Sequence, residues 1–179
     1  VGLYTITENT DLFVYGYTFE KVSSKTYGTA DVTKKSTVEF KLENKFTQDL
    51  GNLEVTKTAK DNNGNAVEGT FKFTISTPMR GFLQADGTFG NEKHYFTIST
   101  GQTLTFENLP ADNYMITEDT ESISVTGYTF NMDASKYSVL GIVTKNGNTN
   151  VKLENDFTQD VGTLRVNKTA QDNHDTNVS

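Results

Sequence analysis

The sequence repeats itself at an offset of 111 in residue number, which restricts the chain to folds that can be built from successive similar units. The segment KLENKFTQD at 41–49 returns as KLENDFTQD at 152–160, and Gly-Tyr-Thr-Phe at 16–19 returns at 127–130. A third block, Leu-x-Val-x-Lys-Thr-Ala, occupies 53–59 and again 164–170. We therefore expect three parts: 1–48 is the C-terminal part of a preceding repeat, 49–159 is a complete repeat, and 160–179 is the N-terminal strand of a following repeat.

The junctions between these parts contain no Pro-rich or Gly/Ser-rich spacer, so successive repeats should be joined with little slack, as in a stiff rod. The two flanks, 1–48 and 160–179, are together much shorter than the complete repeat at 49–159. Their combined length argues against completing one repeat by pairing between neighbouring molecules. A piece of a longer repetitive chain is therefore favoured over a subunit that polymerises by strand exchange.

The composition favours strands over helices, because the chain has 14 Gly, only 2 Pro and 11% aromatic residues beside many Thr and Val. We expect an all-β fold with little helix, a Greek-key β-sandwich of the immunoglobulin-like or prealbumin-like kind, repeated head to tail. Asn63-Gly64 and Asn146-Gly147 are typical of hairpin turns.

The charge and the missing residue types exclude several classes of function. A net charge of −7 argues against a nucleic-acid partner, whose phosphates require clustered Lys and Arg. The chain has no cysteine and no apolar run long enough to span a membrane, so neither a disulfide framework nor membrane contact is expected. We expect no cofactor and no metal, and signals for export or anchoring would lie outside this segment.

Period-2 alternation places three polar side chains on the apolar faces of their strands. Each continues the apolar face of its segment: Lys57 in 53–59, Glu118 in 114–118 and Asn155 in 151–157. Burying such groups without partners is costly, so the three must satisfy one another. They could form a hydrogen-bonded cluster or an ion pair, or they could react.

A reaction is chemically reasonable because burial lowers the pKa of a lysine and raises that of a glutamate. The neutral amine of Lys57 could attack the side-chain carbonyl of Asn155. Glu118, protonated, would polarise this carboxamide and shuttle protons as ammonia leaves. The product would be an amide bond between the first and last strands, without buried charge.

Four motifs carry a resemblance to a known family: Val55-Thr56-Lys57, the segment 109–118 from Leu-Pro to Glu118, Gly127-Tyr128-Thr129, and Leu153-Glu154-Asn155. Together they make residues 49–159 similar to the Cna-B, or SpaA-like, domains of Gram-positive pilins and adhesins. The resemblance implies a cross-link between Lys57 and Asn155, with Glu118 catalytic. It departs from the family at Ala111-Asp112-Asn113, where Ala-Gly-x is usual.

The same strand parity and the repeat extend these roles to the partial units. Glu8 is the equivalent of the catalytic glutamate in the preceding repeat. Asn44 and Lys168 are equivalents of the cross-linking residues, and each lies in an incomplete repeat.

By this resemblance the chain is a structural stalk or spacer of a cell-wall-attached bacterial adhesin or pilus-like fibre, outside the cell. It would not be an enzyme, apart from forming its own cross-link. Its partners would be neighbouring repeats of the same chain, with a host or microbial ligand bound at a distal tip. The alternatives are a ligand- or glycan-binding module of a secreted surface protein, and the self-assembling filament subunit.

Two other features point to no site. The segment 61–66 begins like a calcium loop but lacks the sixth-position glycine, and the twelfth position is Lys72 instead of a glutamate. His94 and His174 are too far apart and too different in context to indicate a metal site or a catalytic triad.

Overall fold

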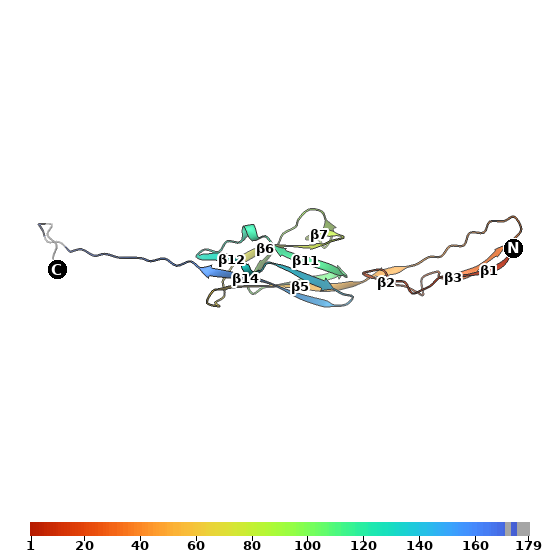
Figure 1. Ribbon diagram of the computed structural model, residues 1–179, viewed down its shortest axis with the longest axis horizontal. Helices are drawn as coiled ribbons and strands as arrows, with labels where there is room; N and C mark the ends of the chain where they lie inside the picture. The colour runs from red at the N-terminus through yellow and green to blue at the C-terminus, as the bar shows by residue number, and fades with distance from the viewer. Residues whose placement is uncertain (171–172, 175–179) are drawn as a thin grey trace.

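The computed structural model describes residues 1–170, 173 and 174, and it confirms an all-β fold. The described chain is elongated, with residues 1–48 forming a narrow extension at one end of a central two-sheet domain (Figure 1). The elements, in chain order, are β1 (Gly2–Thr7), β2 (Tyr17–Phe19), β3 (Tyr27–Val32), β4 (Phe46–Gln48), β5 (Leu50–Asp61), β6 (Thr70–Thr77), β7 (Gly81–Leu83), β8 (Phe89–Gly90), β9 (Phe96–Ser99), β10 (Thr103–Pro110), β11 (Asp112–Glu118), the 3-10 helix η1 (Thr120–Ser122), β12 (Tyr128–Lys136), β13 (Ser138–Val143) and β14 (Asn148–Gln159).

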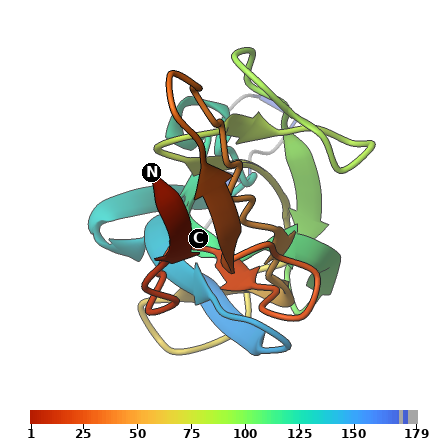
Figure 2. The same ribbon diagram turned by 90° about the vertical axis from the view of Figure 1, so that its right-hand side faces the viewer.

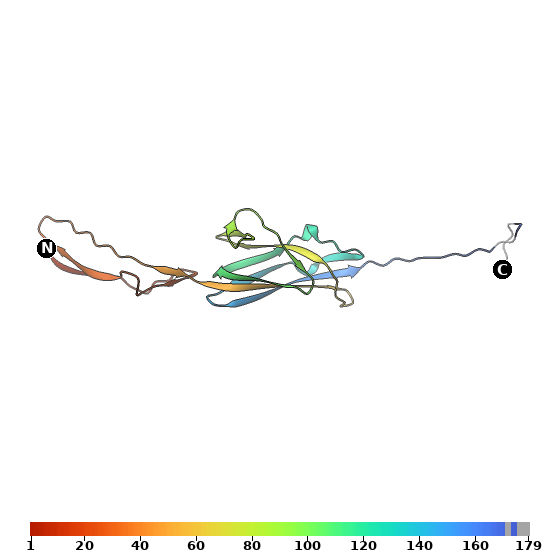
Figure 3. The same cartoon turned by 180° about the vertical axis from the view of Figure 1, so that it is seen from behind.

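Two sheets build the central domain. One has the strand order β10-β5-β14-β12, and the other has the order β13-β11-β6-β7-β8, with β9 also paired to β6. In the first sheet β5 and β14, the first and last strands of the domain, lie side by side and parallel, in register from Asn52 opposite Asn148 to Asp61 opposite Phe157. The long ribbons of these two strands can be followed from behind in Figure 3.

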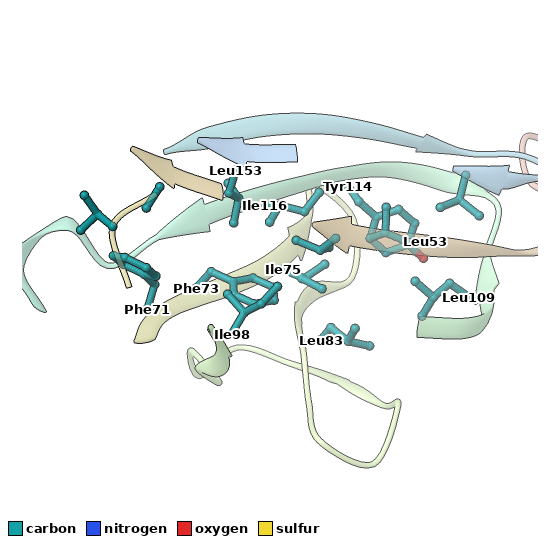
Figure 4. Close-up of a cluster of buried hydrophobic side chains, with 14 of the residues drawn as sticks. Leu53, Phe71, Phe73, Ile75, Leu83, Ile98, Leu109, Tyr114, Ile116 and Leu153 are labelled. Atoms are coloured by element: carbon teal, nitrogen blue, oxygen red, sulfur yellow. The ribbon is translucent and has the colours of Figure 1, made fainter. Parts of the chain in front are cut away.

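The core lies between these two sheets, because alternate residues of each strand point inward. In β5 the alternation holds along the whole strand, so that Leu53, Val55 and Ala59 are buried on one face. The opposite sheet contributes Phe71, Phe73, Ile75, Tyr114 and Ile116, and Figure 4 shows these side chains filling the space between the ribbons.

Residues 1–48 form two small two-stranded sheets, β1-β3 and β2-β4, and share none of this core. Their pairing follows that of the domain at the period of the sequence repeat. Tyr17 lies opposite Gln48 as Tyr128 lies opposite Gln159. Figure 2, which looks along the long axis, places this extension in front of the domain.

Both Asn-Gly turns are found where the sequence indicates turns. The first closes a short local hairpin, in which Lys60 bridges Ala66 antiparallel and the N–H of Val67 donates to the carbonyl of Ala59 at 3.0 Å. Gly64 adopts a φ of 84° after β5, and Asn146 a φ of 54° between β13 and β14. The second turn is not a hairpin: it joins β13 and β14, which belong to different sheets, so it carries the chain across the core. The left-handed conformation that Asn-Gly favours serves such crossings as well as hairpins.

Residues 160–170, which the sequence assigns to the first strand of a following repeat, are exposed and form no strand in this chain. The equivalent strand β5 is held by β10 and β14 on either side. No described strand offers such pairing to 160–170. The backbone N–H and carbonyl groups of a strand form their hydrogen bonds with a neighbouring strand. Without such a neighbour, residues 160–170 do not form a strand.

Candidate functional site

Lys57 and Asn155 enter the core from the two parallel strands at the centre of the four-stranded sheet. Lys57 is directly opposite Leu153, two residues before Asn155, so both polar side chains point to the same face of neighbouring strands. The side chain of Lys57 is fully buried and Asn155 is 1% exposed. The strand parity expected from the sequence therefore holds for both residues.

Glu118 reaches the same place from the opposite sheet. It ends β11, where it pairs with Phe73 of β6 and donates its backbone N–H to the carbonyl of Tyr137 at 2.8 Å. Its carboxylate oxygen Oε1 lies 2.8 Å from Nζ of Lys57, and neither side chain is exposed to solvent. The pair thus links the two sheets through the middle of the core.

Aromatic rings close this site against water. Nζ of Lys57 lies 4.4 Å from the centroid of the Phe71 ring, and the rings of Phe71 and Phe157 are 6.3 Å apart. Phe130, which lies opposite Phe157 on β12, packs against that ring at 5.6 Å. The sequence analysis did not single out these rings as part of the site, although Phe71 and Phe157 lie on the inward face of their strands.

Burial in this apolar site disfavours the charged forms of both members of the pair. Desolvation lowers the pKa of Lys57, although the neighbouring Glu118 opposes the change. Desolvation likewise raises the pKa of Glu118, opposed by Lys57 and by the Asn155 amide. Transfer of one proton from the ammonium to the carboxylate would leave a neutral amine and a neutral acid, the forms that burial favours.

The polar atoms of the site have few other partners. Neither side-chain atom of Asn155 forms a well-aligned hydrogen bond, although the amide lies close enough to Glu118 to affect its pKa, and the contact between Lys57 and Glu118 is likewise close but not aligned as a hydrogen bond. A buried amide that makes no hydrogen bond costs about 1–3 kcal/mol. This arrangement is therefore poor as a permanent polar cluster, and it brings an amine, a carboxyl group and a carboxamide into one water-excluded space.

The three residues that the sequence repeat aligns with this site are in different surroundings. Within residues 1–48, Nδ2 of Asn44 donates to Oε1 of Glu8 at 2.8 Å, and Asn44 is exposed. Lys168 is exposed in the segment that follows β14. The structure thus brings together a glutamate and an asparagine within residues 1–48, and no described strand supplies a lysine beside them as β5 does in the domain.

The features that the sequence analysis set aside are ordinary structural elements. The carboxylate of Asp61 accepts the backbone N–H groups of Asn63 and Asn65 at 2.8 and 2.9 Å, which closes the loop after β5. His94 stacks edge-on against Phe96 at 4.7 Å. Among residues 1–170, 173 and 174, no cluster of three or more His, Asp or Glu side chains is arranged to hold a metal ion. Within this described part, no helix has the length and apolar character to cross a membrane.

One surface carboxylate on β14 is strongly perturbed. Hydrogen bonding to Lys136, together with Lys152, lowers the pKa of Glu154 to about 2. Lys152 Nζ lies 3.0 Å from this carboxylate, and Lys136 faces it from β12. The pair between Lys136 and Glu154 joins β12 to β14 on the side away from Asn155, whereas Lys152 and Glu154 both belong to β14.

The comparisons with known proteins give a family and distant structural similarities. A sequence profile described as "Domain of unknown function (DUF5979)" matches residues 53–158, more than half of the chain. No curated protein matches the sequence.

Among solved structures, a minor pilin of the Gram-positive pathogen Streptococcus agalactiae is 13% identical with a TM-score of 0.47, over 88% of this chain and 66% of that one. The major pilin T-13 of Streptococcus pyogenes is 18% identical with a TM-score of 0.43, over 88% and 66%. The group B streptococcus pilus 2b backbone protein is 16% identical with a TM-score of 0.41, over 73% and 48%. The chain thus spans only part of the length of each.

Proposed function

We propose that this chain, which belongs to the DUF5979 family of domains of unknown function, is a structural stalk segment of a bacterial surface adhesin or pilus-like fibre, stabilised by an isopeptide bond that it forms itself. The observation that carries the proposal is the buried site in which Nζ of Lys57 lies 2.8 Å from Glu118, with Asn155 on the adjacent strand. Three such groups are unfavourable in an apolar core as they stand, and a reaction between them removes the buried charges.

The reaction joins Nζ of Lys57 to Cγ of Asn155. The neutral amine attacks the carboxamide carbon while protonated Glu118 donates to the carboxamide and stabilises the charge that develops there. The bond from Cγ to Nδ2 then breaks, and the amide nitrogen leaves as ammonia after taking up the proton that Lys57 gives up, passed on through Glu118. One N–C bond forms, one breaks, and the carboxyl group of Glu118 is regenerated.

The proposed bond would tie the first strand of the domain to the last. It would close a loop of roughly 100 residues and so restrict the unfolded chain as a long-range disulfide does. For a protein without cysteine this offers an extracellular cross-link that reduction cannot break. Its partners would be neighbouring repeats, with ligand binding left to a distal tip, and the chain would be held at the bacterial cell wall.

Tandem repetition is supported by pairings that recur at the sequence period. Lys25 lies opposite Glu43 as Lys136 lies opposite Glu154. Glu8 donates its N–H to the carbonyl of Thr26 at 2.8 Å, as Glu118 does to Tyr137. We propose on this basis that 1–48 is the second half of the same Cna-B-type Greek-key unit, that 49–159 is a complete unit, and that 160–179 begins the next one.

The exposed aromatic side chains within residues 1–48 do not favour a ligand- or glycan-binding module. Tyr4 is 53% exposed, whereas its counterpart in the repeat, Tyr114, is fully buried in the core of the domain. The exposure of Tyr4 therefore has a simple cause, because no strand among the described residues covers the β1-β3 sheet as the β5-β14 sheet covers β11.

The mass of the intact, denatured chain tests the proposal. We expect the parent protein to be lighter than its sequence by one ammonia, and Glu118→Ala to have the full sequence mass. Glu8→Ala is the matched control, since it removes the equivalent carboxyl group where no lysine is adjacent, and it should keep the ammonia loss. Fragmentation should place the link between Lys57 and Asn155. If the parent protein has the full sequence mass, the cross-link is ruled out, and Lys57, Glu118 and Asn155 form only a polar cluster in the core.

A further inference from the structure

The junction between residues 1–48 and the domain is held by Asp49. Its carboxylate oxygen Oδ1 accepts a hydrogen bond from Oγ1 of Thr18 at 2.6 Å and lies 3.1 Å from Nζ of Lys145. Lys145 also donates to the Thr18 hydroxyl. Thr18 belongs to the preceding unit and Lys145 to the loop between β13 and β14 of the domain, so three side chains span the boundary.

The backbone of Asp49 binds both sides as well. Its N–H donates to the carbonyl of Gly16 at 2.8 Å, and its carbonyl accepts from the N–H of Ala111 at 2.8 Å. Gly16 approaches so closely that a Cβ atom there would lie 2.9 Å from the Ala111 carbonyl oxygen. The junction is therefore a packed contact made by backbone and side chains, and the segment 46–50 contains no flexible spacer.

At the C-terminal end of the domain, the counterparts of Thr18, Asp49 and Gly16 are arranged in the same way. Oγ1 of Thr129 donates to Oδ1 of Asp160 at 2.8 Å, and the Asp160 N–H donates to the carbonyl of Gly127 at 2.9 Å. Each residue lies 111 positions after its counterpart at the first junction. Around Gly127, however, a Cβ atom would meet nothing within 4 Å, so the place that Ala111 fills at the first junction is open.

The turn that carries the lysine of this contact also occurs twice in the chain. Lys145 lies in the turn that Gly147 closes by donating to the Thr144 carbonyl at 2.9 Å. The segment 33–36 forms the same turn 111 positions earlier, and Lys35 and Asn146 adopt φ values of 62° and 54° at equivalent places. Lys34 is thus the counterpart of Lys145, but it forms no ion pair with any residue in the described part of the chain.

From this geometry we infer that each repeat of the proposed stalk is clasped to the next copy of itself: Thr129 and Asp160 at its C-terminal end receive the lysine-bearing turn of the following repeat, as Thr18 and Asp49 receive Lys145. The clasp fixes the angle between neighbouring repeats and makes the stalk stiff. The partner is a second copy of this repeat, presented by the same chain.

A single exposed ion pair would contribute little to such stiffness, because solvent and salt screen it. The clasp differs in that Asp49 is positioned by two backbone hydrogen bonds and its carboxylate is shared by two donors. Hydrogen bonding from Thr18, assisted by Lys145, lowers the pKa of Asp49, so the carboxylate stays charged at neutral pH. Loss of either donor should loosen the joint without unfolding the domain.

Because the chain has no cysteine, two spin labels can be placed uniquely at Val22→Cys and Asp133→Cys, both at exposed positions on opposite sides of the joint. In the full chain we expect a single narrow distance distribution. Lys145→Ala and Thr18→Val should broaden it, and Thr18→Val leaves the sequence of the domain unchanged. Lys34→Ala is the matched control and should superimpose on the parent.

A broad distribution in the parent, unchanged widths in both clasp variants, or equal broadening by Lys34→Ala would each overturn the clasp. The inference rests on the tandem arrangement proposed above, and the two can fail separately. The intact mass of the same labelled samples reports the cross-link, so a loose joint in a cross-linked chain would refute the clasp alone.

Discussion

Replacing Asn155 by leucine prevents the proposed cross-link while keeping both members of the buried ion pair. Leucine has nearly the shape of asparagine and leaves Lys57 paired with Glu118 at 2.8 Å, so no buried charge loses its partner. It cannot accept the amine, and the loop between the two strands stays open in the unfolded chain. Asn155→Leu therefore removes the constraint on the unfolded chain, and it also keeps in the folded core the ion pair that the reaction would neutralise.

The expected magnitude follows from the size of that loop. Lys57 and Asn155 enclose nearly the whole domain, and closing a loop of about 100 residues stabilises the folded state by about 4.7 kcal/mol in the chain-entropy treatment. For a domain of this size, such a change corresponds to a decrease in Tm on the order of 20 °C. Burial of the introduced leucine side chain, worth about 1.5–3 kcal/mol, would offset part of this loss, so a clear decrease in Tm should remain.

Differential scanning calorimetry of the parent, Asn155→Leu and Asn44→Leu would measure the effect. Asn44 is the exposed counterpart of Asn155 in the preceding unit, so its replacement should leave the Tm of the domain unchanged. If mass spectrometry shows the bond in the parent and yet Asn155→Leu melts within a few degrees of it, the loop-entropy argument is wrong. If Asn44→Leu lowers the Tm equally, the decrease in Tm comes from replacing a polar side chain by an apolar one and not from losing the cross-link.

Three further outcomes are expected. Tyr114→Phe removes the buried hydroxyl that donates to the Pro110 carbonyl at 2.8 Å, and should lower the free energy of unfolding by about 1 kcal/mol in denaturant titrations. The pKa of Glu154 is lowered to about 2, so the ionised carboxylate stabilises the fold above pH 4.5, the ordinary pKa, and this contribution is lost as the pH falls through about 2. The Tm measured between these pH values should therefore decrease as the pH falls, and the decrease should be smaller in Glu154→Gln. Stretched from its ends, the cross-linked domain should gain no length from the residues between the two bonded strands, whereas Asn155→Leu should release about 300 Å at roughly 3.3 Å per residue; an equal gain in the cross-linked parent would contradict this.

Strand parity was sufficient to predict the three buried polar residues, because the two-residue period of a strand fixes the direction of each side chain once its apolar neighbours are known. Lys57 and Asn155 are inward for the same reason as Leu53 and Phe157. What parity cannot give is which strands are neighbours. That β14 lies parallel to β5, and that β11 faces them from the other sheet, depends on long-range packing.

The same limit on prediction from local sequence applies to the Asn-Gly turns and to the junction at Asp49. Asn146-Gly147 signals a local backbone conformation, which the structure has, but not whether the flanking strands pair with each other. The repeat placed Asp49 at a boundary between units, yet nothing local marks its contact with Lys145, which lies far away in the sequence. Contacts of this kind become visible only when two units are seen together.

The placement of the site relative to the chain ends explains why a cross-link between these particular strands would suit a load-bearing role. Tension enters the domain at Leu50, at the start of β5, and leaves at Gln159, at the end of β14. Because β5 and β14 are parallel neighbours, these ends lie at opposite ends of the pair, and pulling shears the whole ladder of hydrogen bonds between the strands at once. A covalent bond between Lys57 and Asn155 lies within that ladder, so force would pass from one strand directly to the other. The sheets around it would then carry no load, and the clasp at Asp49 lies where that force enters the domain.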